Sequence, residues 1–236
     1  MSLKNILSET WSFFRLNAAH VFSGRAVWFM VLAGGVFLAV VVLNLIGRET
    51  VFTARRIYDL LLIPGILLVF YPAAFAVQND KDAGMLETIF GIPDYRYKVW
   101  MVRSLTLYIL AAVFLFVLAL FCRAGLADFS LGKMVLELMV PVLFVGSLAF
   151  FLAAWTGSGL AAAVLMVVAL LLFWLFREPL AASPWFLFHN PFTEGNEIMA
   201  LVWAKTTIAN RLYFLSGALV LTMLALLRLQ KREKFI

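Results

Sequence analysis

The sequence predicts an all-α polytopic membrane protein with six transmembrane helices. Of its 236 residues, 64% are hydrophobic and only 14% are charged, and the mean hydropathy is +1.00. Soluble globular proteins are about 45–50% apolar and about 25% charged, and a chain of this size cannot enclose such an excess in one core. The apolar residues also gather in runs that approach the roughly 20 residues a spanning helix needs. These observations exclude a soluble enzyme and a soluble binding domain.

Six apolar runs, separated by charged or polar residues, are the predicted spans. They occupy residues 26–47, 60–77, 104–122, 138–154, 158–176 and 212–227. The second run contains Pro64 and Pro72, which membrane helices tolerate where neighbours satisfy the freed carbonyls. Only residues 155–157 separate the fourth run from the fifth, which predicts a tight helical hairpin. We expect a single transmembrane domain over 1–236, made of an interface segment (1–25), a six-span bundle (26–228) and a tail (229–236).

The distribution of Lys and Arg predicts the orientation of these spans. With the N-terminus inside, 11 of the 19 basic residues lie on the cytoplasmic side and 8 on the outer side. Cytoplasmic segments of membrane proteins carry the excess of Lys and Arg, so both termini are expected in the cytoplasm. The net charge of +6 fits contact with anionic lipid. We expect a lipid membrane, and no nucleic acid, as the partner of this basic chain.

Residues 3–22 predict an amphipathic helix that lies in the membrane interface. Leu3, Leu7, Trp11 and Phe14 recur at steps of three and four, while Arg15 falls away from this stripe. This is the pattern of a helix with its apolar face in the headgroup region. Two interpretations are open: a plain surface anchor, or an elbow that also contacts a cytoplasmic partner.

The predicted cytoplasmic loop between spans two and three, residues 78–103, is expected to hold a short helix. Asp80 and Asp82 suit a helix N-terminus, where carboxylates are favourable. An apolar stretch follows from Ala83 to Phe90 and is broken before Pro93, after which a second helix would lead into span three. The short helix is either a docking element or a simple connector on the membrane.

The predicted outer loop, residues 177–211, is too aromatic for a solvated loop. It contains Pro184, Trp185, Phe188 and Pro191 within one short cluster. Contiguous apolar surface of this kind is normally covered, so we expect one or two short re-entrant helices in the outer leaflet. The alternative is an aromatic belt that anchors the fold.

The chain lacks the motifs of the enzymes most often found in membranes. Around the Gly132-Lys133 pair a P-loop would need Gly at 127 and Ser or Thr at 134, where Ala127 and Met134 stand. His20 and His189 lie on opposite predicted sides, which argues against a metal site or a Cys/His nucleophile. We therefore predict no catalytic residue, no metal and no cofactor in this chain.

Two further observations bear on function. The Gly157-Ser158-Gly159 sequence is similar to a Gly-flanked protease serine, but no span supplies the histidine base, and small residues usually permit close helix packing. The predicted spans are also nearly free of ionisable groups, which ion-coupled transporters usually need. This absence favours a transport pathway energised by another subunit.

The loop from Asp80 to Glu87 resembles that of the type-2 ABC transporter permease family. The run Asp80-Lys81-Asp82-Ala83-Gly84-Met85-Leu86-Glu87 is followed by Pro93 and by Arg103 before span three. The family commonly shows acidic residues, Gly-Thr-Leu-Glu, a proline and a lysine in this order. Here Met85 replaces the threonine and Arg103 replaces the lysine. The expected interface helix, six spans and outer insertion extend the resemblance over the whole chain.

The resemblance implies the permease subunit of an ATP-driven exporter in a bacterial or archaeal inner membrane. A second copy or a paralogue would complete the pathway, and a cytoplasmic ABC ATPase would bind ATP and Mg²⁺. The loop would then supply a coupling helix that contacts the ATPase through Asp82, Gly84, Met85, Leu86, Glu87, Thr88, Ile89, Phe90, Pro93 and Arg103.

Alternative functions are a haem-exporter-type B subunit of cytochrome c maturation, a non-transport scaffold or sensor with this fold, and an intramembrane enzyme. A wall rich in Phe and Leu without buried charge favours amphipathic cargo over a small ion.

Overall fold

The computed structural model describes residues 25–46, 52–85, 96–181, 183–192 and 197–230. All regular elements in these ranges are helical, which confirms the all-α prediction. They are α2 (Arg25–Ile46), α3 (Ala54–Ala74), α4 (Ala76–Asp82), η1 (Arg96–Met101), α6 (Val102–Gly125), α7 (Leu131–Thr156), α8 (Gly159–Leu175), α9 (Arg177–Leu180) and α10 (Glu197–Arg228). The predicted interface helix, with Trp11, Phe14 and Arg15, lies outside the described residues.

Four helical segments are long and apolar enough to cross a membrane. They are Ala54–Ala74, Val99–Gly125, Leu131–Thr156 and Met199–Arg228. The described apolar parts of α2 and α8 are shorter, Val27–Leu43 and Gly159–Leu175. The chain is thus a multi-pass membrane protein by the length and composition of its helices.

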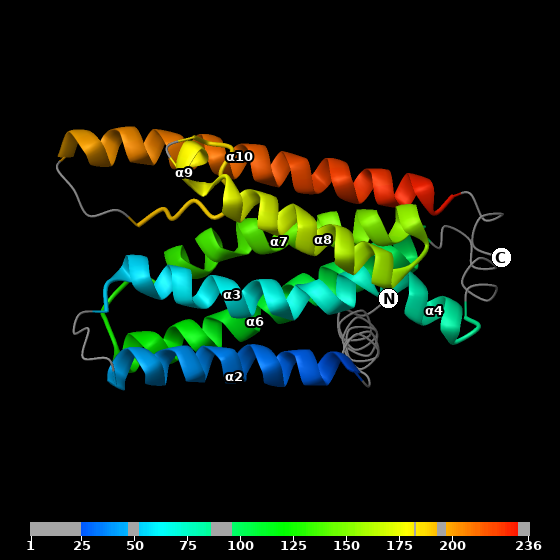
Figure 1. Cartoon of the computed structure of the whole chain (residues 1–236), viewed down its shortest axis with the longest axis horizontal. Coiled ribbons are helices and arrows are strands. Elements are labelled where there is room, and N and C mark those ends of the chain that lie inside the picture. Colours follow the sequence, from blue (N-terminus) through cyan, green and yellow to red (C-terminus); the bar gives the residue numbers. More distant parts are fainter. Residues whose placement is uncertain (1–24, 47–51, 86–95, 182, 193–196, 231–236) are drawn as a thin grey trace, which may run out of the picture.

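The long helices alternate in direction along the bundle (Figure 1). One end, which we call the α4 end, carries α4, the turn between α7 and α8, and the last residues of α10. The other end, the α9 end, carries the start of α3, α9 and the link from α6 to α7. Arg228 lies over the Trp155 ring at 4.9 Å, which places the last turn of α10 beside the last turn of α7. Because α2 begins and α10 finishes at the α4 end, the described chain enters and leaves the bundle on one side.

Helix α7 is the centre of the bundle, since it contacts α3, α6, α8 and α10. The Tyr108 ring of α6 packs directly against Gly146 of α7. A Cβ at position 146 would lie 2.8 Å from that ring. The Tyr108 hydroxyl is 3.1 Å from Ser147 Oγ, which also accepts a 3.0 Å hydrogen bond from Thr222 of α10. Small residues and interhelical hydrogen bonds of this kind hold membrane helices together, where the hydrophobic effect cannot.

The predicted hairpin of α7 and α8 is confirmed. Gly157 ends α7 with a positive φ of 67°, and Ser158 caps α8 by accepting a hydrogen bond from the Ala161 amide at 3.4 Å. Glycine adopts a left-handed φ without the steric penalty that a Cβ brings. The two helices therefore reverse direction within two residues.

Three helices begin at least six residues earlier than the apolar runs predict. Helix α3 begins at Ala54, α7 at Leu131 and α10 at Glu197, ahead of the predicted 60, 138 and 212. Charged residues interrupt the apolar pattern in each extension, yet the backbone stays helical because the helix satisfies its own hydrogen bonds. A run-length rule measures the apolar stretch and misses the polar turns that continue the same helix.

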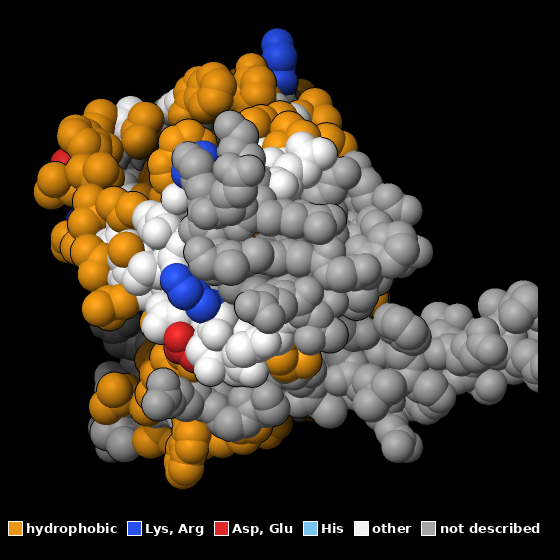
Figure 2. All heavy atoms as spheres, turned by 90° about the vertical axis from the view of Figure 1, so that its right-hand side faces the viewer, with side chains coloured by type: hydrophobic (Ala, Val, Ile, Leu, Met, Phe, Trp, Pro, Cys, Tyr) orange, Lys and Arg blue, Asp and Glu red, His pale blue; other side chains and the backbone are white. Residues whose placement is uncertain are grey.

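The outward faces of α8 and α10 are strongly apolar. Leu160, Leu175, Leu201 and Leu219 are each at least 66% exposed. Figure 2 shows the α4 end, where hydrophobic side chains of the described residues gather on the flank of the bundle. Apolar surface of this extent normally needs a partner or lipid as its solvent.

Candidate functional site

Residues of the predicted coupling segment lie at the α4 end, but the helix there differs from the expected one. Helix α4 ends at Asp82, and residues 83–85 form a turn in which Gly84 has a φ of +64°. The Gly84 amide donates to Lys81 O at 3.0 Å and the Met85 amide to Asp80 O at 2.9 Å. These two bonds form a Schellman motif, the ordinary glycine-terminated end of a helix.

The expectation that a helix begins at Ala83 with two acids at its N-terminus is therefore wrong. Asp80 and Asp82 lie in the last turn of α4, and Gly84 stops that helix rather than taking part in the next one. Asp82 and Met85 are exposed on this end. The remaining predicted residues, Leu86, Glu87, Thr88, Ile89, Phe90 and Pro93, lie outside the described residues.

A buried ion pair joins α4 to the start of α6. Arg103 donates to Asp80 Oδ2 at 2.7 Å, and the side chain of Asp80 is 1% exposed while that of Arg103 is 14% exposed. The guanidinium also lies 5.2 Å from the centroid of the buried Trp100 ring. A buried charge must be paired because its desolvation is expensive. The motif residue Arg103 thus forms an ion pair within the chain, and a small part of its side chain remains exposed.

Helix α4 is also attached to α8. The Gly159 amide, at the first turn of α8, donates to Gln78 Oε1 at 2.6 Å. A Cβ on Gly159 would lie 2.5 Å from the Phe75 ring, so the two elements touch here without room for a side chain. Together with the Asp80–Arg103 pair, this contact holds α4 against both α6 and α8.

A second polar cluster occupies the α9 end, with Arg211 of α10 at its centre. Its guanidinium donates to Glu137 Oε2 of α7 at 2.7 Å, to Tyr58 Oη of α3 at 3.2 Å, to the His189 carbonyl at 3.2 Å and to Asn210 Oδ1 at 2.8 Å. Arg211 is 8% exposed. The expectation of a wall without buried charge is therefore wrong, since Arg211 is buried among partners from α7, α3, the loop and α10 itself.

The predicted outer-loop residues form an irregular segment, residues 183–192, and not the expected short helices. Among the described residues of the loop only α9 is a separate helix, and the later helical stripe belongs to the first half of α10. Asn210 Nδ2 donates to the carbonyls of Pro184 and Phe186 at 2.8 Å each. Buried carbonyl groups outside a helix need hydrogen-bond donors from elsewhere in the protein. Asn210 and Arg211 donate to carbonyls of this loop, so the loop is stable without helical hydrogen bonds.

The aromatic residues of this loop take different positions. Trp185 is 59% exposed and stacks on Tyr213 with ring centroids 4.5 Å apart. Phe188 and Pro191 are half-buried. Asn190 is buried, and its Nδ2 donates to Asp59 Oδ1 at 2.9 Å and to Arg55 O at 2.8 Å. The loop is thus fastened to α3 and α10, while Trp185 keeps an outward face.

His189 is neutral in this setting. Burial, and to a smaller extent the nearby charge of Arg211, together lower the pKa of its imidazole to about 4. Its Nε2 lies 2.8 Å from Thr207 Oγ1, which itself donates to the Trp203 carbonyl. When the hydroxyl proton points to that carbonyl, the hydroxyl accepts from His189 and Nε2 carries the ring proton.

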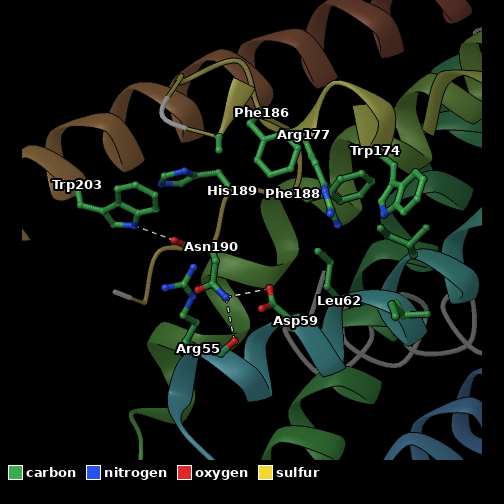
Figure 3. Close-up of a pocket in the computed structure, with 13 residues that line it drawn as sticks. Arg55, Asp59, Leu62, Trp174, Arg177, Phe186, Phe188, His189, Asn190 and Trp203 are labelled. Atoms are coloured by element: carbon green, nitrogen blue, oxygen red, sulfur yellow. Dashed lines mark hydrogen bonds between the residues drawn. The ribbon is translucent and has the colours of Figure 1, made fainter. Parts of the chain in front are cut away.

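A cavity of about 650 Å³ opens between α3, the end of α8, α9 and the loop. In Figure 3, Arg55 and Asp59 rise from α3, and Arg177 extends past the Phe188 and Trp174 rings. The complete lining is Arg55, Asp59, Leu62, Ile63, Ile66, Trp174, Arg177, Ala181, Phe186, Phe188, His189, Asn190 and Trp203. Most of these lining residues are apolar or aromatic. The charged ones are Arg55 and Asp59 from α3 and Arg177 from α9.

Sequence reasoning missed the Arg211 cluster and this cavity. The sequence does contain a signal for the ion pair: Glu137 and Arg211 each directly precede an apolar run, on the same predicted side of the membrane. Opposite charges of that kind are candidates for a pair. The cavity had no such signal, since its lining comes from segments more than 100 residues apart in the sequence.

No family model matches the chain, and no curated protein or solved structure is significantly similar to it. Among the described residues, no group of three or more His, Cys, Asp or Glu is placed to hold a metal ion.

Proposed function

We propose that the chain is the membrane-spanning permease subunit of an ATP-driven exporter. It would cross a bacterial or archaeal inner membrane six times, with α2 and α8 as the two further spans and both termini in the cytoplasm. A second copy or a paralogue would complete the pathway, and a separate cytoplasmic ABC ATPase would supply the energy of ATP hydrolysis with Mg²⁺.

The observation that carries the proposal is the anchoring of α4. The Asp80–Arg103 pair at 2.7 Å and the Gln78–Gly159 bond at 2.6 Å attach this helix to α6 and α8. A force applied to the exposed residues that follow α4 would pass into two long helices through packed contacts, as energetic coupling between distant sites requires. This arrangement suits a subunit that is driven by a partner at the α4 end.

The test is purification of the tagged full chain in a mild detergent, followed by mass spectrometry of the proteins that co-elute. A stoichiometric ATPase supports the proposal. A chain that elutes without any ATPase, and whose residues 80–93 are open to protease, contradicts it and favours the scaffold or sensor.

Variants then locate the contact. Glu87→Lys should abolish stimulation of the bound ATPase while the permease still purifies in normal yield. Asp128→Lys is the matched control, because it reverses an exposed charge at the α9 end. Full stimulation with Glu87→Lys, or an equal loss with Asp128→Lys, would show that the ATPase does not act through this segment.

A further inference from the structure

We propose that the cavity beside α3 and α9 binds an anionic amphiphile, with its apolar chain along α3 and its negatively charged headgroup beside Arg55 and Arg177. This inference concerns a binding site in the isolated chain, and it does not depend on whether the chain transports anything.

The apolar wall of the cavity fits a hydrocarbon chain. Leu62, Ile63 and Ile66 line it from α3 and Trp174 lines it from α8. Ile63 is 50% exposed although it lies within a helix long enough to span a membrane. A volume of about 650 Å³ lies within the range of roughly 300–1,000 Å³ of known ligand sites. The cavity is therefore large enough for a ligand, and its apolar wall reaches an exposed face of α3.

The charge of the lining selects an anion. Arg55 and Arg177 line different sides of the cavity and are both exposed, and the Arg177 guanidinium lies 5.5 Å from the Trp174 ring centroid. Asp59 is the one acid of the lining, and its Oδ1 already accepts from Asn190 at 2.9 Å. With His189 neutral, the lining carries one net positive charge. Each basic residue near a membrane surface contributes about 1 kcal/mol to the binding of anionic lipid.

An unsatisfied polar atom gives a second reason to expect a ligand here. His189 lines the cavity and is 1% exposed, and its Nδ1 has no hydrogen-bond partner among the described residues. Because Nε2 carries the ring proton, Nδ1 is an acceptor. Buried acceptors are rarely left unpaired. Nδ1 is covered in this structure, so a headgroup hydroxyl, as in phosphatidylglycerol, would supply the missing donor once the imidazole turns toward the cavity.

The experiment uses the full chain alone, purified in mild detergent, with bound lipid measured by native mass spectrometry. Dioleoyl phosphatidylglycerol is compared with dioleoyl phosphatidylcholine at equal concentration, and glycerol phosphate is added as a headgroup without chains. We expect preferential retention of phosphatidylglycerol. Arg55→Gln and Arg177→Gln should each weaken its binding about fivefold, which corresponds to the loss of one basic residue.

Two further variants keep the test decisive. Arg56→Gln removes a charge from the same turn of α3 but outside the lining, so it should bind phosphatidylglycerol as the original chain does. Ile66→Trp narrows the apolar part of the cavity while both arginines remain, and it should also lose the lipid. Unchanged melting temperatures show that these variants are folded.

Equal retention of the two lipids, or normal binding by Arg177→Gln, would overturn the proposal. Displacement of the lipid by glycerol phosphate at equal concentration would overturn it too, because the site would then recognise a free anion. No ATPase is present, so these results are separate from the test of the permease function.

Discussion

Arg211 is the residue on which the polar contacts of the α9 end converge. Its partners Glu137, Tyr58 and the His189 carbonyl come from α7, α3 and the loop, so one side chain of α10 joins three other segments. Breaking a buried ion pair is far more damaging than replacing both partners, because the remaining charge has no compensation.

Arg211→Met should therefore destabilise the protein by about 3–5 kcal/mol, measured by reversible unfolding in mixed detergent. Adding Glu137→Leu should restore part of this loss, since no charge is then left without its partner. The control is Arg123→Gln, which breaks an exposed pair with Asp128 and should change stability by less than about 1 kcal/mol. A loss as small as that of the control would contradict the assigned role of Arg211.

His189 makes the α9 end sensitive to acid. Its folded pKa of about 4 lies below the ordinary value of 6.5. Between these values the unfolded chain binds a proton that the folded chain does not, so the free energy of unfolding falls as the pH falls. The expected slope is about 1.4 kcal/mol per pH unit for one proton.

A series of unfolding measurements from pH 7 to pH 4.5 checks this. The original chain should lose stability over this interval, and His189→Gln should show a flatter profile because its amide does not titrate. Equal pH dependence in both proteins would assign the acid sensitivity to other groups.

At the scale of elements, α4 shows how a short helix is held. Asp80 faces inward to Arg103, whereas Asp82 of the same turn is exposed. These two acids form a matched pair for testing what the buried contact does.

Asp80→Asn should loosen α4 from α6 and speed backbone hydrogen exchange in residues 76–82, because Arg103 loses its charged partner. Asp82→Asn should leave the exchange rates unchanged, since its side chain is exposed and its hydrogen bond from Gln78 is 3.4 Å long. Similar exchange in the two variants would mean that apolar contacts, rather than the ion pair, hold α4.

Two glycine substitutions test how closely the start of α8 packs against the residue that precedes α4. Gly159→Ala places a methyl group 2.5 Å from the Phe75 ring and should cost about 1–3 kcal/mol through overpacking. Gly34→Ala in α2 meets no atom within 4 Å and should be neutral or stabilising, because alanine is the better helix former. Thermal unfolding in detergent distinguishes the two, and equal effects would argue against the close contact of α4 and α8.

At the scale of the whole molecule, the alternation of the helices places α4 and the link from α6 to α7 at opposite ends of the bundle (Figure 1). Met85 follows α4 in the chain, and Asp128 belongs to that link. The orientation of that bundle in the membrane is a prediction that rests on the Lys and Arg distribution alone.

Cysteine labelling in intact cells tests the orientation. In a Cys122→Ala background, Met85→Cys should be protected from a membrane-impermeant reagent, and Asp128→Cys should react. The Asp128 side chain is 90% exposed, whereas Asn190 is only 8% exposed and would react poorly in either orientation. The reverse labelling pattern would overturn the predicted orientation.

The sequence by itself determined that the chain is helical and crosses a membrane several times, because apolar run length and composition are local properties. The Gly157 turn was also readable, since a three-residue gap leaves no other connection. The expected start of a short helix at Ala83 was wrong, although Gly84 is an ordinary helix terminator. The prediction gave more weight to the apolar residues after position 83 than to this glycine.

Only the tertiary structure decided which charges are buried. Asp80 with Arg103, and Glu137 with Arg211, are separated by 23 and 74 positions, and their pairing depends on how the helices pack. A charged residue beside an apolar run has the same sequence pattern whether it faces water or a partner of opposite charge. A buried charge is stabilised by a partner far away in the sequence. Patterns that extend over one or two helical turns therefore carry no information about which residue that partner is.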